Sequence, residues 1–150
     1  MEDLGLERLL EELKQNIISR HVSAGQVVSG KTKAGFEVKT ISAFRGQLLG
    51  YTYSGVLERG RRAGRIPKNF TAIIAKWAAV KGITFASDRD RARFAYFVAK
   101  KIKEQGTMMY RQKREEDVFT TATLRFEDML SIEIGALFEN EVKNKVFDAI

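Results

Sequence analysis

The chain has 150 residues, 44% of them hydrophobic and 30% charged, which fits one globular domain with a hydrophobic core of its own. Cysteine is absent, and this excludes disulfide bonds, zinc–thiolate centres and thiol catalysis. The net charge of +7 favours an acidic partner, whether nucleic acid, an acidic protein surface or a membrane face. No apolar run approaches the ~20 residues that span a bilayer. The acidic start Met1-Glu2-Asp3 is unlike a signal peptide, so we expect a soluble protein made where it is used.

The first third of the chain predicts an amphipathic helix followed by strands. Over residues 2–22, leucine and isoleucine recur at helical spacing with charged residues between them. A short β-like pair, Val27-Val28, comes next, and residues 36–41 then alternate as a half-buried strand does. Residues 47–57 have a strand-like composition. Because Gly46 separates these last two runs, we expect a hairpin there.

The rest of the chain predicts three helices. The first covers residues 70–81 and is stopped by Gly82, and the second begins after an N-cap at Ser87 and is closed by Gly106. After a polar segment, the last helix covers residues 117–145. The order of elements predicts an α+β fold, a single domain over the whole chain. Its small antiparallel sheet packs with an N-terminal helix and three C-terminal helices.

Helical spacing also predicts which side chains of these helices are buried. Ile73, Trp77 and Val80 share one face of the first C-terminal helix, with Trp77 as a core anchor. The predicted buried stripe of the last helix consists of Phe126, Met129, Leu130, Leu137 and Phe138.

The most informative segment is a loop rich in arginine and glycine at residues 57–67. Two glycines and a proline can hold a defined shape, while four arginines concentrate positive charge. Its candidate contact residues are Glu58, Arg59, Gly60, Arg61, Arg62, Gly64, Arg65 and Pro67. A second basic group follows: Lys100, Lys101, Lys103, Arg111, Lys113 and Arg114. Both groups fit either a solvated surface or contact with phosphates or acidic neighbouring subunits.

No motif in the chain predicts catalysis, a metal ion or a cofactor. Residues 25–32 (GQVVSGKT) match the phosphate-binding loop pattern, but a helix precedes them and a β-like run follows, so we interpret the match as accidental. The single histidine, His21, fits a helix terminus better than a general base. The acidic residues 115–117 fit the start of the last helix.

Four groups of residues also carry a resemblance to a known family. They are Ser29–Thr32; Leu48–Tyr51 with Leu57–Gly64 and Pro67; Ile74–Trp77 with Lys81–Ile83; and Ala99–Ile102 with Gly106-Thr107. In this order and spacing they resemble the neck and tail-completion proteins of tailed bacteriophages, the minor tail component or head–tail joining family.

The resemblance implies a non-enzymatic virion protein, assembled in the cytoplasm of the host bacterium. It implies a homo-oligomeric ring, of six or twelve copies, that completes the tail or joins it to the head. The partners would be further copies of the chain and neighbouring neck and tail proteins. DNA passing through the channel is a further candidate partner, and a membrane is not one.

If the chain forms a ring, residues 57–67 are expected to make an inter-subunit or inter-ring contact. A closed ring needs two different complementary patches on each subunit. The acidic residues of the first helix, Glu7, Glu11 and Glu12, are the candidate second patch. The main alternative is a small basic module that binds nucleic acid non-specifically, and a third, weaker reading is an ATP-dependent enzyme built on residues 25–32.

Overall fold

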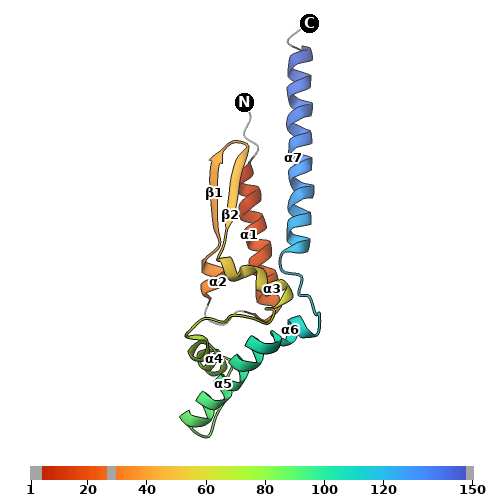
Figure 1. The fold of residues 1–150 in the computed structure, drawn as a ribbon. Helices are drawn as coiled ribbons and strands as arrows, with labels where there is room; N and C mark the ends of the chain where they lie inside the picture. Colours follow the sequence, from red (N-terminus) through yellow and green to blue (C-terminus); the bar gives the residue numbers. More distant parts are fainter. Residues whose placement is uncertain (1–4, 27–29, 148–150) are drawn as a thin grey trace. The chain divides into compact units, whose positions relative to one another are not determined.

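The computed structural model describes residues 5–26 and 30–147 and confirms the α+β class. Its contacts divide the chain into two compact units, each assembled from segments that are distant in the sequence. We call the first the sheet unit; it comprises Met1–Gly25, Thr32–Tyr51 and Asp117–Ile150. We call the second the helical unit; it comprises Gln26–Lys31 and Thr52–Glu116. Figure 1 labels the α-helices and strands of both.

In the sheet unit, α1 (Leu6–Ser23) packs against a two-stranded antiparallel hairpin of β1 (Glu37–Ser42) and β2 (Arg45–Leu49). The predicted helix and hairpin are therefore confirmed. A short helix, α2 (Lys31–Ala34), precedes the hairpin. Gly46 lies within β2 rather than in the turn, opposite Thr40. A Cβ there would collide with the Leu10 side chain, so the missing side chain lets α1 approach the hairpin closely.

The predicted strand over residues 47–57 is wrong beyond Leu49. Glu37 pairs with Leu49 at the end of the hairpin, so the chain after β2 has no further strand to pair with. It turns instead into a 3₁₀-helix, η1 (Thr52–Gly55), and then into α3 (Val56–Arg59). The predicted β-like pair Val27-Val28 lies outside the described residues.

The last helix, α7 (Thr120–Phe147), lies antiparallel to α1 within the sheet unit. Three ion pairs define the register of the two helices. Arg20 pairs with Asp117 at 2.6 Å, Glu12 with Arg125 at 3.3 Å, and Arg8 with Glu133. Val118 and Ala122, near the start of α7, are almost completely buried.

The predicted buried stripe of α7 is only partly correct. Phe126, Met129, Leu130 and Leu137 are half-buried, but Phe138 is 67% exposed. The register explains this difference. Because Arg8 in the first turns of α1 pairs with Glu133, most of the remaining 14 residues of α7 extend past the first residue of α1.

In the helical unit, α4 (Phe70–Val80) packs against α5 (Asp88–Gln105), as Figure 1 shows. The predicted N-cap is confirmed, because the Ser87 side chain accepts a hydrogen bond from the Asp90 amide. The polar segment after α5 contains one unpredicted turn of helix, α6 (Met108–Arg111), whose N-cap is Thr107.

The predicted buried face of α4 is wrong. Ile73 is 45% exposed, Trp77 37% and Val80 52%, so Trp77 is not a core anchor. The face that packs instead contains Ile74 and the fully buried Ala78, and α5 contributes Ala95 and Ala99. These small side chains allow the two helices to approach closely, which turns the large side chains of α4 outward.

Candidate functional site

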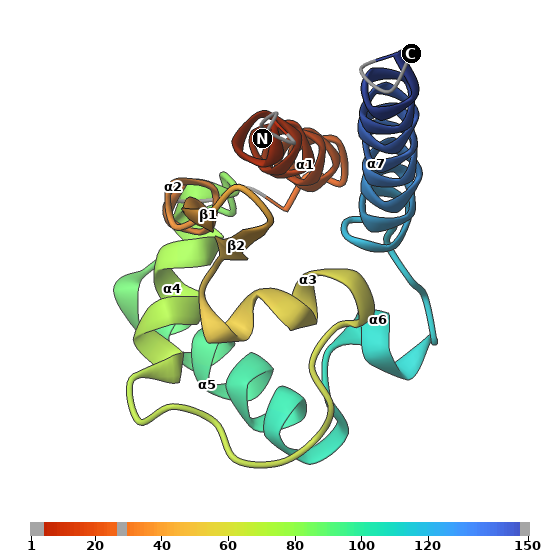
Figure 2. The same cartoon turned by 90° about the horizontal axis from the view of Figure 1, so that it is seen from above.

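The arginine loop, residues 60–67, has its backbone fixed against the junction of α5 and α6. The Gly64 amide donates to the Lys103 carbonyl oxygen at 2.8 Å, and the Thr107 amide donates to the Arg61 carbonyl oxygen at 2.8 Å. The Arg61 amide in turn donates to the Thr107 hydroxyl oxygen at 3.0 Å. Figure 2 follows the chain from α3 past α6 and the end of α5 to α4. The loop therefore has the defined shape that its glycines and proline predict.

Two glycines, Gly60 and Gly106, make this close approach possible. Both have positive φ, 75° and 81°, with nearly extended ψ, a conformation that is essentially restricted to glycine. A Cβ at Gly60 would lie 2.5 Å from the Thr107 hydroxyl oxygen, and one at Gly106 would lie 2.6 Å from the Arg61 carbonyl oxygen. Either side chain would push the loop away from the α5–α6 junction.

The four arginines of this region have different roles. The half-buried Arg61 donates to the carbonyl oxygen of Arg65 and lies 5.9 Å from the centre of the Phe70 ring, so it holds the loop together. Arg59 forms an exposed ion pair with Glu115 at 3.4 Å. Among the described residues, no ion pair or side-chain hydrogen bond involves the exposed guanidinium groups of Arg62 and Arg65. These two side chains are therefore the ones that an external partner can reach.

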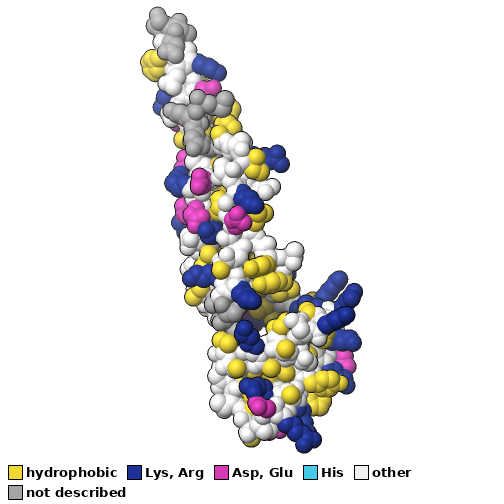
Figure 3. All heavy atoms as spheres, turned by 90° about the vertical axis from the view of Figure 1, so that its left-hand side faces the viewer, with side chains coloured by type: hydrophobic (Ala, Val, Ile, Leu, Met, Phe, Trp, Pro, Cys, Tyr) yellow, Lys and Arg dark blue, Asp and Glu magenta, His cyan; other side chains and the backbone are white. Residues whose placement is uncertain are grey.

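The helical unit carries the protein's excess positive charge, and the rest of the chain is slightly acidic. Residues 52–116 contain 16 of the 26 lysines and arginines but only six of the 19 acidic residues, a net charge of +10. The remaining residues have a net charge of −3. The two basic groups predicted from the sequence meet here, because Gly64 of the loop binds the carbonyl oxygen of Lys103. In Figure 3, Lys and Arg side chains gather at the edge of this unit, in the lower part of the view.

The remaining residues of the predicted loop site have backbone roles in the same unit. The Glu58 carbonyl oxygen accepts from the Glu116 amide at 2.8 Å, and the Pro67 carbonyl oxygen accepts from the Phe70 amide at 3.1 Å. These bonds connect the ends of the loop to the segment after α6 and to the start of α4.

The acidic residues predicted as the second patch lie on α1, in the sheet unit. Glu11 accepts hydrogen bonds from Lys14 and from Gln15, each at 3.1 Å, and these bonds, that from Lys14 first, lower the pKa of its carboxyl group. Glu12 pairs with Arg125, as described above. Glu7 is exposed in the first turn of α1. Two of the three carboxylates thus already have basic or amide partners within the chain.

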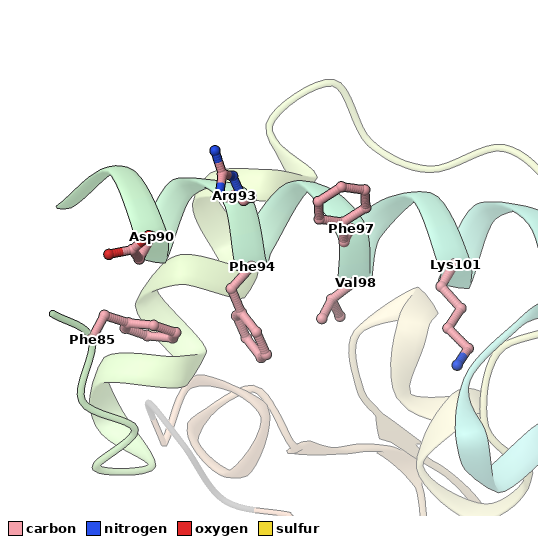
Figure 4. A pocket seen from close by; sticks show the side chains of 7 residues that line it. All are labelled: Phe85, Asp90, Arg93, Phe94, Phe97, Val98 and Lys101. Carbon is pink, nitrogen blue, oxygen red and sulfur yellow. The ribbon is translucent and has the colours of Figure 1, made fainter. Parts of the chain in front are cut away.

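Sequence reasoning missed an apolar groove on α5. A hollow of about 380 Å³ is lined by Phe85, Phe94, Phe97 and Val98, with Asp90, Arg93 and Lys101 at its rim (Figure 4). The pattern of α5 contains a signal for it. Phe94, Phe97 and Val98 follow one another at helical spacing beside Ala95 and Ala99, so the apolar surface is wider than packing against α4 requires.

The remaining candidates from the sequence are His21 and the phosphate-loop pattern. His21 is 2% exposed, in the last turn of α1. The phosphate-loop pattern follows α1 and leads into the single turn α2, and its residues 27–29 lie outside the described part. Across residues 5–26 and 30–147, no three histidine or acidic side chains are grouped as metal ligands. The helices described there include none that is long and apolar enough to cross a membrane.

Comparison of the chain with protein-family models, with curated proteins and with solved structures finds no match.

Proposed function

We propose that this chain is a structural virion protein of a tailed bacteriophage, which forms a ring at the neck and there completes the tail or joins it to the head. The proposal starts from the resemblance of residues 29–110 to neck and tail-completion proteins. It needs no catalytic site, cofactor or metal ion. It does need surfaces on each copy that bind neighbouring subunits.

The observation that carries the proposal is the fixed arginine loop. Its backbone is fixed before any partner binds, so binding through Arg62 and Arg65 has little loop entropy to lose. A fixed loop that presents two exposed guanidinium groups suits an acidic protein surface on a neighbouring subunit.

A second observation supports association with other subunits. Ile73, Trp77 and Val80 form an apolar stripe along α4 that is between 37% and 52% exposed. Tryptophan is the residue type most enriched among the side chains that dominate binding energy at protein interfaces. Exposed apolar stripes of this kind mark interaction sites.

The test is complementation of a parent phage that carries a stop codon in this gene. Without the protein, electron microscopy of the lysate should show filled heads beside unattached or malformed tails. A plasmid copy of the natural gene should restore infectious particles, and the variant Arg62→Glu/Arg65→Glu should not. The matched control is Lys33→Glu/Arg45→Glu, which reverses two exposed charges in the sheet unit and should restore growth. Normal particles from the stop-codon phage would refute the proposal.

Non-specific binding to nucleic acid is the second candidate function, and the net charge of +10 on residues 52–116 favours it. A protein that contacts about six phosphates loses affinity by roughly a thousandfold between 50 and 200 mM salt. Fluorescence anisotropy with a labelled DNA duplex over this range measures that slope. A steep slope combined with normal particles from the stop-codon phage would establish this function in place of the first.

A further inference from the structure

We infer that the acidic outer face of α7 on one copy of the chain docks into the apolar groove on α5 of the next copy. This inference rests on the proposed ring, and it names a further pair of surfaces through which neighbouring subunits would bind.

The groove on α5 is apolar in its middle, with Lys101 at one end and Arg93 beside Asp90 at the other. The ring centroids of Phe85 and Phe94 lie 5.2 Å apart, and Figure 4 shows the two rings side by side, while Phe97 is 58% exposed. Arg93 and Lys101 flank these side chains, and in the described part of the chain neither is in an ion pair. The groove therefore suits an occupant with an apolar centre and acidic ends.

The acid at this rim, Asp90, has hydrogen-bond partners of its own in the N-cap of α5. The Asp90 carboxylate accepts a hydrogen bond from the Ser87 hydroxyl at 2.7 Å. The Asp90 backbone amide donates to the Ser87 hydroxyl oxygen, which is the N-cap of α5. Asp90 also lies in the first turn of the helix, where the helix dipole stabilises a negative charge. Arg93 and Lys101 thus remain available to a partner.

The outer face of α7 has the complementary order of side chains. At 100° per residue, Asp128, Ile132, Gly135, Phe138 and Glu139 fall within an arc of roughly 120°, on the opposite side from Ala122 and Glu133, which face α1. Ile132 is 71% exposed and Phe138 is 67% exposed. Residues 126–142 contain five acidic residues and no lysine or arginine. The face therefore runs from an acid through two apolar side chains to a second acid.

The lengths of the two surfaces also agree. Asp128 and Glu139 are 11 positions apart, about 16 Å along the helix, and Arg93 and Lys101 are eight positions apart, about 12 Å. The long basic side chains cover the difference. Glu139 has an exposed i,i+4 pair with Lys143 at 2.6 Å, which competes only weakly with a partner.

Contacts within a single chain do not explain why position 135 of this face is a glycine. Glycine is unfavourable in the interior of a helix, and a Cβ at this position would meet nothing within 4 Å. A missing side chain between Ile132 and Phe138 leaves a shallow notch, which suits the exposed Phe97 ring of a neighbouring copy. The contact is heterologous, because each copy supplies a groove and a different face, and repeated contacts of this type form a ring when the rotation between copies closes.

Charge exchange in the full chain tests the inference. Arg93→Glu/Lys101→Glu and Asp128→Lys/Glu139→Lys should each weaken self-association by roughly tenfold or more, and the variant that combines all four should largely restore it. Sedimentation velocity measures the association, and Lys33→Glu/Arg45→Glu serves as the matched control. A natural chain that stays monomeric, or a combined variant that associates no better than its parents, would overturn the inference.

Introduced cysteines distinguish a second copy from contact within one chain, since the natural chain has none. Phe97→Cys protein mixed with tagged Gly135→Cys protein should form a disulfide-linked heterodimer under mild oxidation. A double variant that links only within single chains would overturn docking between copies.

If the natural chain assembles but charge exchange has no effect, this inference fails and the neck proposal stands. If charge exchange behaves as expected and the stop-codon phage is normal, the neck proposal fails instead.

Discussion

Replacing Gly106 with alanine is the most direct test of the fixed arginine loop. Gly106 has φ 81° and ψ 179°, and holding a residue with a Cβ in this conformation costs about 1–3 kcal/mol. The new Cβ would lie 2.6 Å from the Arg61 carbonyl oxygen, so the loop must move. The bond from the Thr107 amide to that oxygen, worth about 1 kcal/mol, is then weakened or lost. We therefore expect Gly106→Ala to lower the free energy of unfolding of the helical unit by about 2–4 kcal/mol.

Urea unfolding followed by the fluorescence of Trp77 measures this change, because Trp77 is the only tryptophan and lies in the helical unit. Hydrogen exchange of the Gly64 amide, which donates to Lys103, reports on the loop itself. Gly55→Ala is the matched control: Gly55 has φ −58°, and a Cβ at this position would meet nothing within 4 Å. It should change stability by less than about 1 kcal/mol. If Gly106→Ala stays within about 0.5 kcal/mol of the natural protein and Gly64 keeps its protection, the argument for a fixed loop is wrong.

Three further predictions concern the sheet unit and the exposed face of α4. Hydrogen bonds from the Thr121 hydroxyl and amide, and then the charge of Arg20, lower the pKa of Asp117. A lowered pKa in the folded state adds stability that is present above the unfolded pKa of about 3.9 and is lost as the pH falls through the folded value. Acid unfolding of Asp117→Asn should therefore lack this part of the pH dependence of the natural protein. Leu9→Ala should lower the free energy of unfolding by about 2–5 kcal/mol in urea titrations, because Leu9 is only 1% exposed. Trp77→Lys should leave the fold intact by circular dichroism and reduce self-association in sedimentation velocity, because this side chain is 37% exposed.

Each of these predictions has a contrary outcome. An Asp117→Asn profile parallel to that of the natural protein would show that this carboxylate contributes nothing to acid unfolding. A Leu9→Ala change below about 1 kcal/mol would contradict a close-packed contact between α1 and the hairpin. Unfolding of Trp77→Lys would mean that Trp77 belongs to the core after all.

Local signals in the sequence were sufficient to predict most of the helices. The N-cap at Ser87 and the stop at Gly106 depend on hydrogen bonds within a few residues, and they lie where the sequence predicts them. The leucines and isoleucines at helical spacing in α1 are buried on one face of the helix, whereas the burial of His21 was not predicted. The strand after Leu49 was mispredicted because strand length depends on a partner, and β1 begins only at Glu37.

The candidate site was only partly predictable. The arginine loop is visible in the sequence as a cluster of charge and glycine, and its exposure follows from that composition. The different roles of Arg61 and Arg62 are not visible, because they depend on the Phe70 ring and on the carbonyl oxygen of Arg65. The groove around Phe97 was not predicted, because the face of α5 that α4 leaves uncovered depends on how these two helices pack.

The sequence by itself determined the α+β class, the positions of the four long helices α1, α4, α5 and α7, the absence of thiol chemistry and the basic character of residues 57–67. These properties depend on composition and on short-range periodicity. Only the tertiary structure decided that α4 packs through Ile74 and Ala78, that the arginine loop binds the α5–α6 junction, and that both basic groups belong to one unit. Those outcomes depend on contacts between distant residues, such as Arg61 and Thr107, which are 46 positions apart. The local pattern of either segment, taken alone, does not show which distant backbone the segment will contact.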